Sequence, residues 1–167
     1  LHSLKCEVED VQRALEAMDY DVLVVDKGTK EAFDSVLSTD FRRRLVILHY
    51  AGHATDEGFK IDDGRSTWLL KASHFARLFG VSMNLRLVFL NGCSTLLQVR
   101  AYEIELAAQR NGIIDCCFIG SLNEIGDELA ADFAEAVYNS LADNSTLAVA
   151  TRNVANFVIS RDYGDDA

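Results

Sequence analysis

Two residues suited to catalysis each follow an apolar run of this sequence. The run Leu45–Leu48 leads into a segment that contains His53, and the run Leu87–Leu90 leads into a segment that contains Cys93. A cysteine thiol has a pKa of about 8.5, and it becomes a strong nucleophile near neutral pH when an imidazole or a helix N-terminus favours its thiolate. His53 is suited to take up the thiol proton and to deliver it later to a leaving amine. The pair predicts thiol catalysis.

The elements that must position this pair are predicted from hydrophobic patterning. Continuous apolar runs separated by helical patterns indicate an α/β fold of three layers, with a mostly parallel central sheet and helices on both faces. Ligands of such sheets bind beyond the carboxyl ends of the strands, where His53 and Cys93 fall. An Asp-Gly pair at 63–64 predicts a β-hairpin. Strands are expected at 22–25, 45–48, 87–90 and 113–119, and helices at 4–18, 30–37, 69–79, 96–110, 127–141 and 146–157, with Ser145 as the N-cap of the last helix.

Composition limits the partners of the chain. Its 167 residues, 49% of them hydrophobic, suffice for one core, so we expect one domain over 1–160 and a loose tail at 161–167. The net charge of −10 repels phosphate backbones and anionic headgroups. No apolar run approaches the roughly 20 residues that a membrane span requires. Neither nucleic acid nor a membrane is therefore expected as a direct partner.

The four cysteines are Cys6, Cys93, Cys116 and Cys117, and their spacing matches neither a zinc site nor a disulfide framework. This usage favours a reducing compartment, the cytoplasm. Cys116 and Cys117 lie in an apolar run, where free cysteine behaves as a small hydrophobe, so both are expected in the core.

A metal site is not expected at His49 and His53. Tyr50 stands where a zincin motif needs glutamate, and the local pattern is that of a strand end. We predict no metal and no cofactor, and we expect His49 to pack beneath the site.

Two longer motifs surround the predicted pair. Residues 48–54 are Leu-His-Tyr-Ala-Gly-His-Ala, and residues 87–95 are Leu-Val-Phe-Leu-Asn-Gly-Cys-Ser-Thr. Together they resemble the His and Cys motifs of CHAT domains, which are relatives of caspases, separases and metacaspases. The resemblance continues at 118–122, 127–128, 131–133 and 137–141, and it implies a caspase-like fold and peptide-bond hydrolysis. Because the family begins with one more strand, we expect that strand upstream of Leu1.

Two backbone N–H groups, those of Ala54 and Cys93, are candidates for an oxyanion hole. Ala54 stands where the family usually has glycine, and alanine tolerates positive φ poorly, so a distorted hole is one expectation. Asn123 stands where relatives often carry tryptophan or proline, which predicts an altered wall of the substrate cleft.

An acidic substrate pocket is implied by the resemblance to separases. Asp127 matches the position that supplies an acidic group to the pocket for the residue before the scissile bond. A carboxylate there would pair with arginine or lysine, with Glu124 or Asp56 as helpers. Asp127 is equally suited to be the N-cap of the helix that follows it.

The sequence thus predicts a cysteine endopeptidase that cleaves proteins or peptides after a basic residue. The resemblance implies the effector domain of a larger bacterial protein, released by regulatory domains or by a partner protein. The alternative is a catalytically silent scaffold or binding module with a caspase-like fold. A flavodoxin-like small-molecule binder is disfavoured, because no glycine-rich phosphate loop follows a strand.

Overall fold

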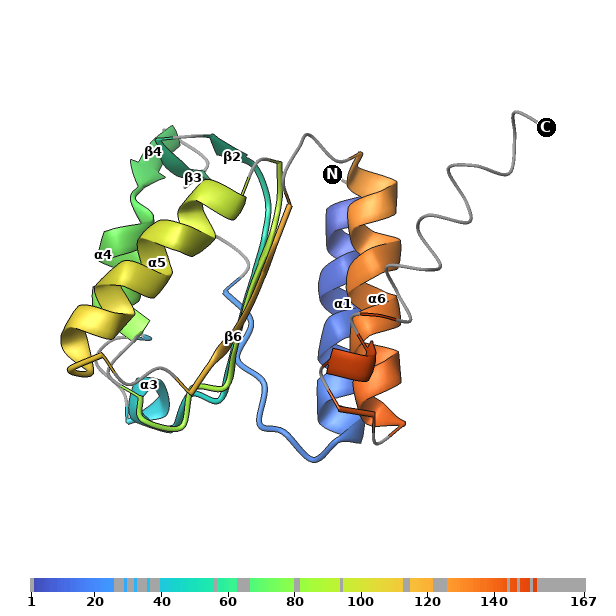
Figure 1. Cartoon of the computed structure of the whole chain (residues 1–167). Helices are drawn as coiled ribbons and strands as arrows, with labels where there is room; N and C mark the ends of the chain where they lie inside the picture. The colour runs from blue at the N-terminus through green and yellow to red at the C-terminus, as the bar shows by residue number, and fades with distance from the viewer. Residues whose placement is uncertain are drawn as a thin grey trace. The chain divides into compact units, whose positions relative to one another are not determined.

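The structure is a computed structural model (Figure 1). The chain forms two compact units. One unit combines Leu1–Val24 with Gly126–Ala167, and the other spans Val25–Ile125. It describes residues 2–25, 29, 32, 36, 40–55, 57–62, 67–79, 82–93, 95–112, 115–121, 126–143, 145–146, 148–150 and 152.

A parallel sheet forms the centre of the unit that spans Val25–Ile125. Its strands are β1 (Ile47–Ala51), β5 (Leu87–Asn91) and β6 (Cys117–Gly120), in the order β1-β5-β6. Both pairs are parallel, and every residue of the central strand β5 is buried. Burial on both faces explains why β5 is a continuous apolar run rather than an alternating one. The predicted α/β class is confirmed.

A second, antiparallel sheet in the same unit follows β1 directly. It consists of β2 (Ala54–Thr55), β3 (Gly58–Asp62) and β4 (Thr67–Leu70), in the order β2-β3-β4. β3 pairs with β4 from Phe59 opposite Leu70 to Asp62 opposite Thr67. The predicted hairpin is therefore confirmed, although its connection at 63–66 lies outside the described residues.

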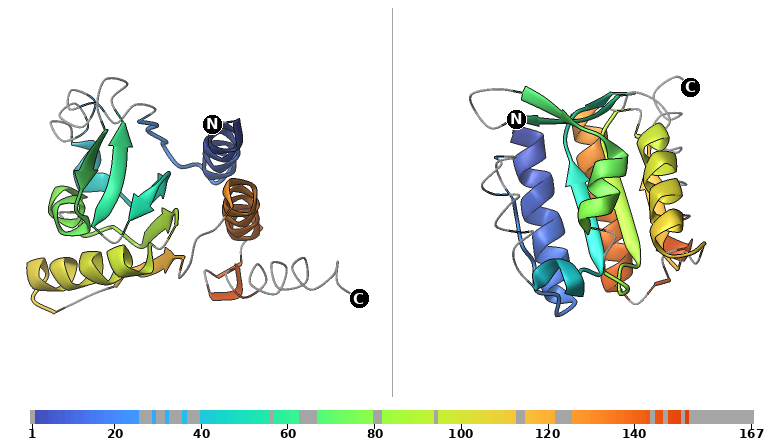
Figure 2. Two further views of the ribbon diagram at one scale, coloured as in Figure 1. Left: turned by 90° about the horizontal axis from the view of Figure 1, so that it is seen from above. Right: turned by 90° about the vertical axis from the view of Figure 1, so that its left-hand side faces the viewer.

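Five helices are described from end to end: α1 (His2–Ala17), α3 (Phe41–Arg44), α4 (Ala72–Phe79), α5 (Leu96–Gln109) and α6 (Asp127–Ala142). In the unit formed by Leu1–Val24 and Gly126–Ala167, α1 packs on α6, and Val11 of α1 and Ala134 and Val137 of α6 are buried. Within the other unit, α4 packs on α5, and both lie on the same face of the parallel sheet (Figures 1 and 2). No helix in the described ranges is long and apolar enough to cross a bilayer.

Aromatic rings fill the space between the sheets and the helices of the Val25–Ile125 unit. Phe75 lies with its ring centroid 5.3 Å from that of Phe59 and 4.9 Å from that of Phe79. Tyr102 of α5 is fully buried beside Phe75 and Phe118, at centroid distances of 6.3 and 6.1 Å. Offset and edge-on contacts at these distances add to the stability gained by burying the rings.

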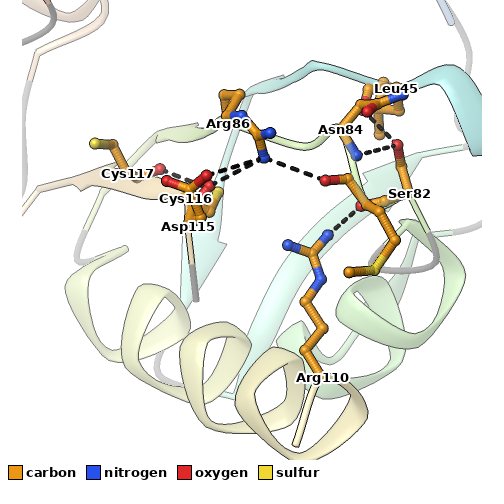
Figure 3. A network of polar contacts seen from close by, with 9 residues as sticks. Leu45, Ser82, Asn84, Arg86, Arg110, Asp115, Cys116 and Cys117 are labelled. Atoms are coloured by element: carbon orange, nitrogen blue, oxygen red, sulfur yellow. Dashed lines mark hydrogen bonds and ion pairs between the residues drawn. The ribbon is translucent and has the colours of Figure 1, made fainter. Parts of the chain in front are cut away.

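A polar network ties together the amino ends of the three parallel strands (Figure 3). The Ser82 hydroxyl bonds to the carbonyl oxygens of Leu45 (2.7 Å) and Arg43 (2.9 Å), just before β1. Arg86, just before β5, donates to the carbonyl oxygen of Asp115 (3.4 Å) and lies 3.5 Å from its carboxylate. These contacts set the strands in register at the end opposite His53 and Cys93.

Several predicted boundaries are wrong. Residues 22–25 form no strand in the described structure and are largely exposed, because an apolar run needs a pairing partner and this one lies where the two units meet in the sequence. The helix expected from 69 begins at Ala72, since Leu69 and Leu70 pair with β3 instead.

The remaining elements are described only in part. Thr146, not Ser145, is the N-cap near the chain end, because its hydroxyl accepts from the Val149 N–H (3.4 Å). Ala32 and Val36 are helical as expected. Four further parts of the prediction lie outside the described residues: the rest of 30–37, residues 113–114, most of 146–157 and the expected tail at 161–167.

Two tyrosine hydroxyls with different surroundings give a stability test. The Tyr102 hydroxyl is buried and has no hydrogen-bond partner among the described residues, whereas the Tyr50 hydroxyl donates to the His53 carbonyl oxygen at 2.7 Å. Tyr102→Phe should leave the free energy of unfolding unchanged or raise it by up to about 1 kcal/mol, and Tyr50→Phe should lower it by about 1 kcal/mol. Urea denaturation measures both. A larger loss for Tyr102→Phe than for Tyr50→Phe contradicts the expectation.

Candidate active site

The segments that carry His53 and Cys93 leave neighbouring strands at the same level. β1 and β5 are parallel, and their last paired residues are Ala51 and Asn91. His53 and Cys93 each stand two residues further on, at the carboxyl edge of the sheet. The Gly52 N–H donates to the Asn91 carbonyl oxygen at 3.1 Å, which continues the pairing beyond the strands. The two candidate residues are therefore carried by adjacent backbone segments.

Two glycines let these segments approach each other. A Cβ atom at Gly92 would lie 2.2 Å from the Gly52 carbonyl oxygen, a distance that no side chain tolerates. Gly52 itself has a φ of +154°, and a Cβ there would lie 3.0 Å from the Tyr50 hydroxyl. Only glycine meets both conditions, because it lacks the Cβ atom and adopts positive φ readily.

The backbone of His53 is fixed, whereas its side chain is exposed. Its carbonyl oxygen accepts hydrogen bonds from the Lys60 N–H (2.8 Å) and from the Tyr50 hydroxyl (2.7 Å). Tyr50 packs on Phe59 with ring centroids 4.5 Å apart, and burial raises the pKa of its hydroxyl above the ordinary value of 10. The hydroxyl is therefore protonated and able to donate at neutral pH.

Cys93 is half-buried in the turn between β5 and α5, and Thr95 holds this turn. The fully buried Thr95 hydroxyl bonds to the carbonyl oxygens of Leu90 (2.6 Å) and Gly92 (3.2 Å), and it accepts from the Ser121 N–H (2.9 Å). One side chain thus links the ends of β5 and β6 at the start of α5. Cys93 lies just before the N-terminus of this helix.

The Ala54 N–H points away from its partner strand. Ala54 lies opposite Phe59 in the antiparallel pairing of β2 with β3. The Lys60 N–H donates to the His53 carbonyl oxygen next to this pair, and hydrogen-bonded and non-hydrogen-bonded pairs alternate along antiparallel strands. Ala54 and Phe59 therefore exchange no hydrogen bonds with each other. Among the described residues, the non-glycine residues with positive φ are Asp19 and Asn111, so Ala54 adopts an ordinary backbone conformation. Alanine is therefore not strained at this position, and the distorted oxyanion hole stays a prediction.

The other cysteines of the Val25–Ile125 unit differ from Cys93. Burial raises the pKa of the Cys116 thiol to about 12, so that this thiol is protonated and unreactive at neutral pH. Cys117 is exposed, and its predicted place in the core is wrong. Successive strand residues face opposite sides, so Cys116 packs against the core while Cys117, one residue later, does not.

His49 lies on β1, four residues before His53. Its ring meets that of Phe89 of β5 edge-on, with centroids 4.9 Å apart. The two residues are directly opposite each other in the pairing of the strands. His49 therefore packs against the neighbouring strand, and its place beneath the site stays a prediction.

The predicted substrate-pocket residues are described less fully. Asp56, Asn123 and Glu124 lie outside the described residues. Asp127 is the first residue of α6, in the other compact unit, and Gly126 is the N-cap, so the N-cap interpretation of Asp127 is wrong. The pocket role of all three acidic residues stays a prediction.

Three positioning contacts were not predicted from the sequence. Besides Tyr50 and Thr95, the buried Gln98 side chain donates from Nε2 to the Thr55 carbonyl oxygen at 2.9 Å, and so links α5 to β2. Tyr50 and Thr95 had a signal in the sequence, as parts of the motifs around His53 and Cys93, whereas Gln98 had none. The partners of Tyr50 and Gln98 depend on how the two sheets meet.

The comparisons with known proteins identify a family for the chain. The model of a family described as CHAT domain matches residues 1–164, which is nearly the whole chain. No curated protein matches the sequence.

The contact between the two glycine segments predicts an asymmetric effect of alanine. Gly92→Ala should lower the free energy of unfolding by about 3 kcal/mol, because the new methyl group would meet a backbone oxygen that cannot turn aside. Gly126→Ala is the control, since no atom of the described residues lies within 4 Å of its Cβ position and the loss there should be at most about 1 kcal/mol. Urea unfolding followed by circular dichroism measures both. Equal losses would show that the two segments are not in close contact.

Proposed function

Because the chain belongs to the CHAT domain family, a group related to caspases, we propose that it is a cysteine endopeptidase with Cys93 as nucleophile and His53 as general acid–base. The observation that supports this most strongly is the edge formed by β1 and β5. Their register and the close approach of Gly52 and Gly92 carry the two residues at the same level on adjacent segments. A thiol and an imidazole placed this way suit acyl transfer.

The proposed reaction has two halves. His53 takes the thiol proton, and the Cys93 sulfur attacks the carbonyl carbon of the scissile peptide bond, so that the carbonyl π electrons move to oxygen. The tetrahedral intermediate collapses to a thioester and expels the amine, which receives its proton from His53. Water then attacks the thioester with His53 as base. The products are a carboxylic acid and the regenerated thiol, and no cofactor or metal is needed.

The negative oxygen of the tetrahedral intermediate needs preorganised donors. The N–H of Ala54, directed away from β3, and the N–H of Cys93 are the proposed pair. Such donors contribute most when they are fixed before the reaction. Ala54 is held next to His53, whose carbonyl oxygen accepts two hydrogen bonds.

Specificity for a basic residue before the scissile bond completes the proposal. Asp127 would pair with the substrate cation, and Glu124 and Asp56 would add negative charge to the pocket. The net charge of −10 favours basic substrates generally. In the cell, the chain would act as the cytoplasmic effector domain of a larger bacterial protein, activated through regulatory domains or a partner.

The first test of the nucleophile is labelling with a peptidyl arginine chloromethyl ketone at neutral pH. The sulfur of Cys93 should displace chloride from the chloromethyl carbon, and mass spectrometry should locate the adduct on Cys93. Cys93→Ala and His53→Ala should abolish this adduct. Cys117→Ala is the matched control and should keep it, because it removes an exposed thiol that has no proposed role.

The outcome that contradicts the proposal is equally specific. An unlabelled Cys93 in the presence of the activating partner would leave a silent caspase-like scaffold as the function. Labelling of Cys117 at the same rate as Cys93 would show that exposure alone determines reactivity.

Asp127→Asn tests the basic pocket. The change removes one negative charge without changing size, so kcat/KM for a peptide with arginine before the scissile bond should fall tenfold or more, equivalent to about 1.4 kcal/mol. Glu128→Gln is the control, because it removes the same charge from an exposed neighbouring position and should change kcat/KM less than about twofold. Preference for an acidic residue at that position of the peptide would refute the basic pocket.

A further inference from the structure

The two proposed oxyanion donors belong to different sheets. Ala54 is the first residue of β2 in the antiparallel sheet, whereas Cys93 follows β5 of the parallel sheet. The distance between the two N–H groups therefore depends on contacts that join the sheets. Mispositioning by about 1 Å can cost about a hundredfold in rate, so such contacts matter for catalysis.

Gln98 provides a direct contact of this kind. It lies in the first turn of α5, five residues after Cys93, and it is only 4% exposed. Its side-chain Nε2 donates to the carbonyl oxygen of Thr55 at 2.9 Å. Thr55 is the residue after Ala54, so the hydrogen bond connects the helix that follows Cys93 with the strand that begins at the other donor.

The helix end that carries Gln98 is itself held in place. The Leu96 N–H donates to the Ser121 carbonyl oxygen (2.8 Å), and the Thr95 hydroxyl bonds to the ends of β5 and β6. A buried amide is costly to leave without a partner, so Gln98 strongly favours the arrangement in which Thr55 stays within reach. β2 contains only two residues and thus has little pairing of its own to resist displacement.

We propose that Gln98 is a positioning residue that sets the separation of the Ala54 and Cys93 N–H groups. This inference rests on the proposed peptidase function. Gln98 acts through the backbone of Thr55 and not on the substrate, and it leaves the Cys93–His53 pair unchanged. Its loss should therefore weaken stabilisation of the oxyanion while preserving the reactivity of the thiol.

The test is Gln98→Met, which keeps the length of the side chain and removes the donor. For an arginine peptide, kcat should fall about tenfold to a hundredfold with KM within about twofold of wild type. Inhibition by a peptidyl argininal, whose thiohemiacetal oxygen occupies the oxyanion position, should weaken by a similar factor. Alkylation of Cys93 by iodoacetamide, which needs no oxyanion hole, should stay within about twofold.

Gln109→Met is the matched control, since Gln109 ends the same helix and its side chain is exposed. This variant should leave kcat, KM, argininal inhibition and the rate of iodoacetamide alkylation unchanged. If Gln98→Met does not fold, Gln98→Asn retains an amide but shortens the side chain by one methylene, which takes the donor out of reach of the Thr55 carbonyl oxygen and should produce the same split.

Two failures are distinguishable. A wild-type protein labelled at Cys93, together with a Gln98→Met variant of unchanged kcat and argininal inhibition, would overturn the role of Gln98 alone. A parallel loss of iodoacetamide reactivity would overturn it as well, because it would indicate a general disturbance of the site. Absence of labelling at Cys93 in the activated wild-type protein would overturn the proposed function and this inference together.

Discussion

The register of β1 against β5 is the constraint on which the candidate site depends. Because Ala51 lies opposite Asn91, the residues two positions further along each chain, His53 and Cys93, leave the sheet side by side. A slip of one residue would move one of them along the edge and turn every side chain of that strand to the other face. The polar network around Ser82 and Arg86 opposes such a slip at the amino ends of the strands.

Hydroxyl groups of the half-buried Tyr50 and the buried Thr95 hold the backbone behind the site, while the candidate catalytic side chains are accessible. Tyr50 bonds to the carbonyl oxygen of His53, and Thr95 bonds to three backbone groups around the turn of Cys93. This division suits catalysis, because preorganised groups lose little entropy at the moment of reaction. The raised pKa of Cys116 shows the opposite case, a thiol that burial keeps protonated.

The site also joins two sheets of different kinds. The parallel sheet carries the proposed nucleophile on its rigid central strand, which is buried throughout. The antiparallel sheet begins at Ala54, directly after the proposed base, and continues into a hairpin. Gln98 links α5 to this hairpin sheet by a hydrogen bond, in addition to the packing of Phe59 against Phe75.

Local patterning alone determined the α/β class and the hairpin at 59–70. It also determined the positions of β1, β5 and α5 within a few residues, and the segments that carry His53 and Cys93. These features follow from hydrophobic period and glycine placement, which act over short distances. The predicted strand at 22–25 is wrong, because a strand forms only when another segment pairs with it and local patterning does not show whether such a segment is near. Only the tertiary structure decided the hydrogen bonds of Tyr50, Thr95 and Gln98. It also decided the exposure of Cys117 and the ordinary φ of Ala54. Each of these properties depends on residues that are distant in sequence or on the strand pairing around the residue.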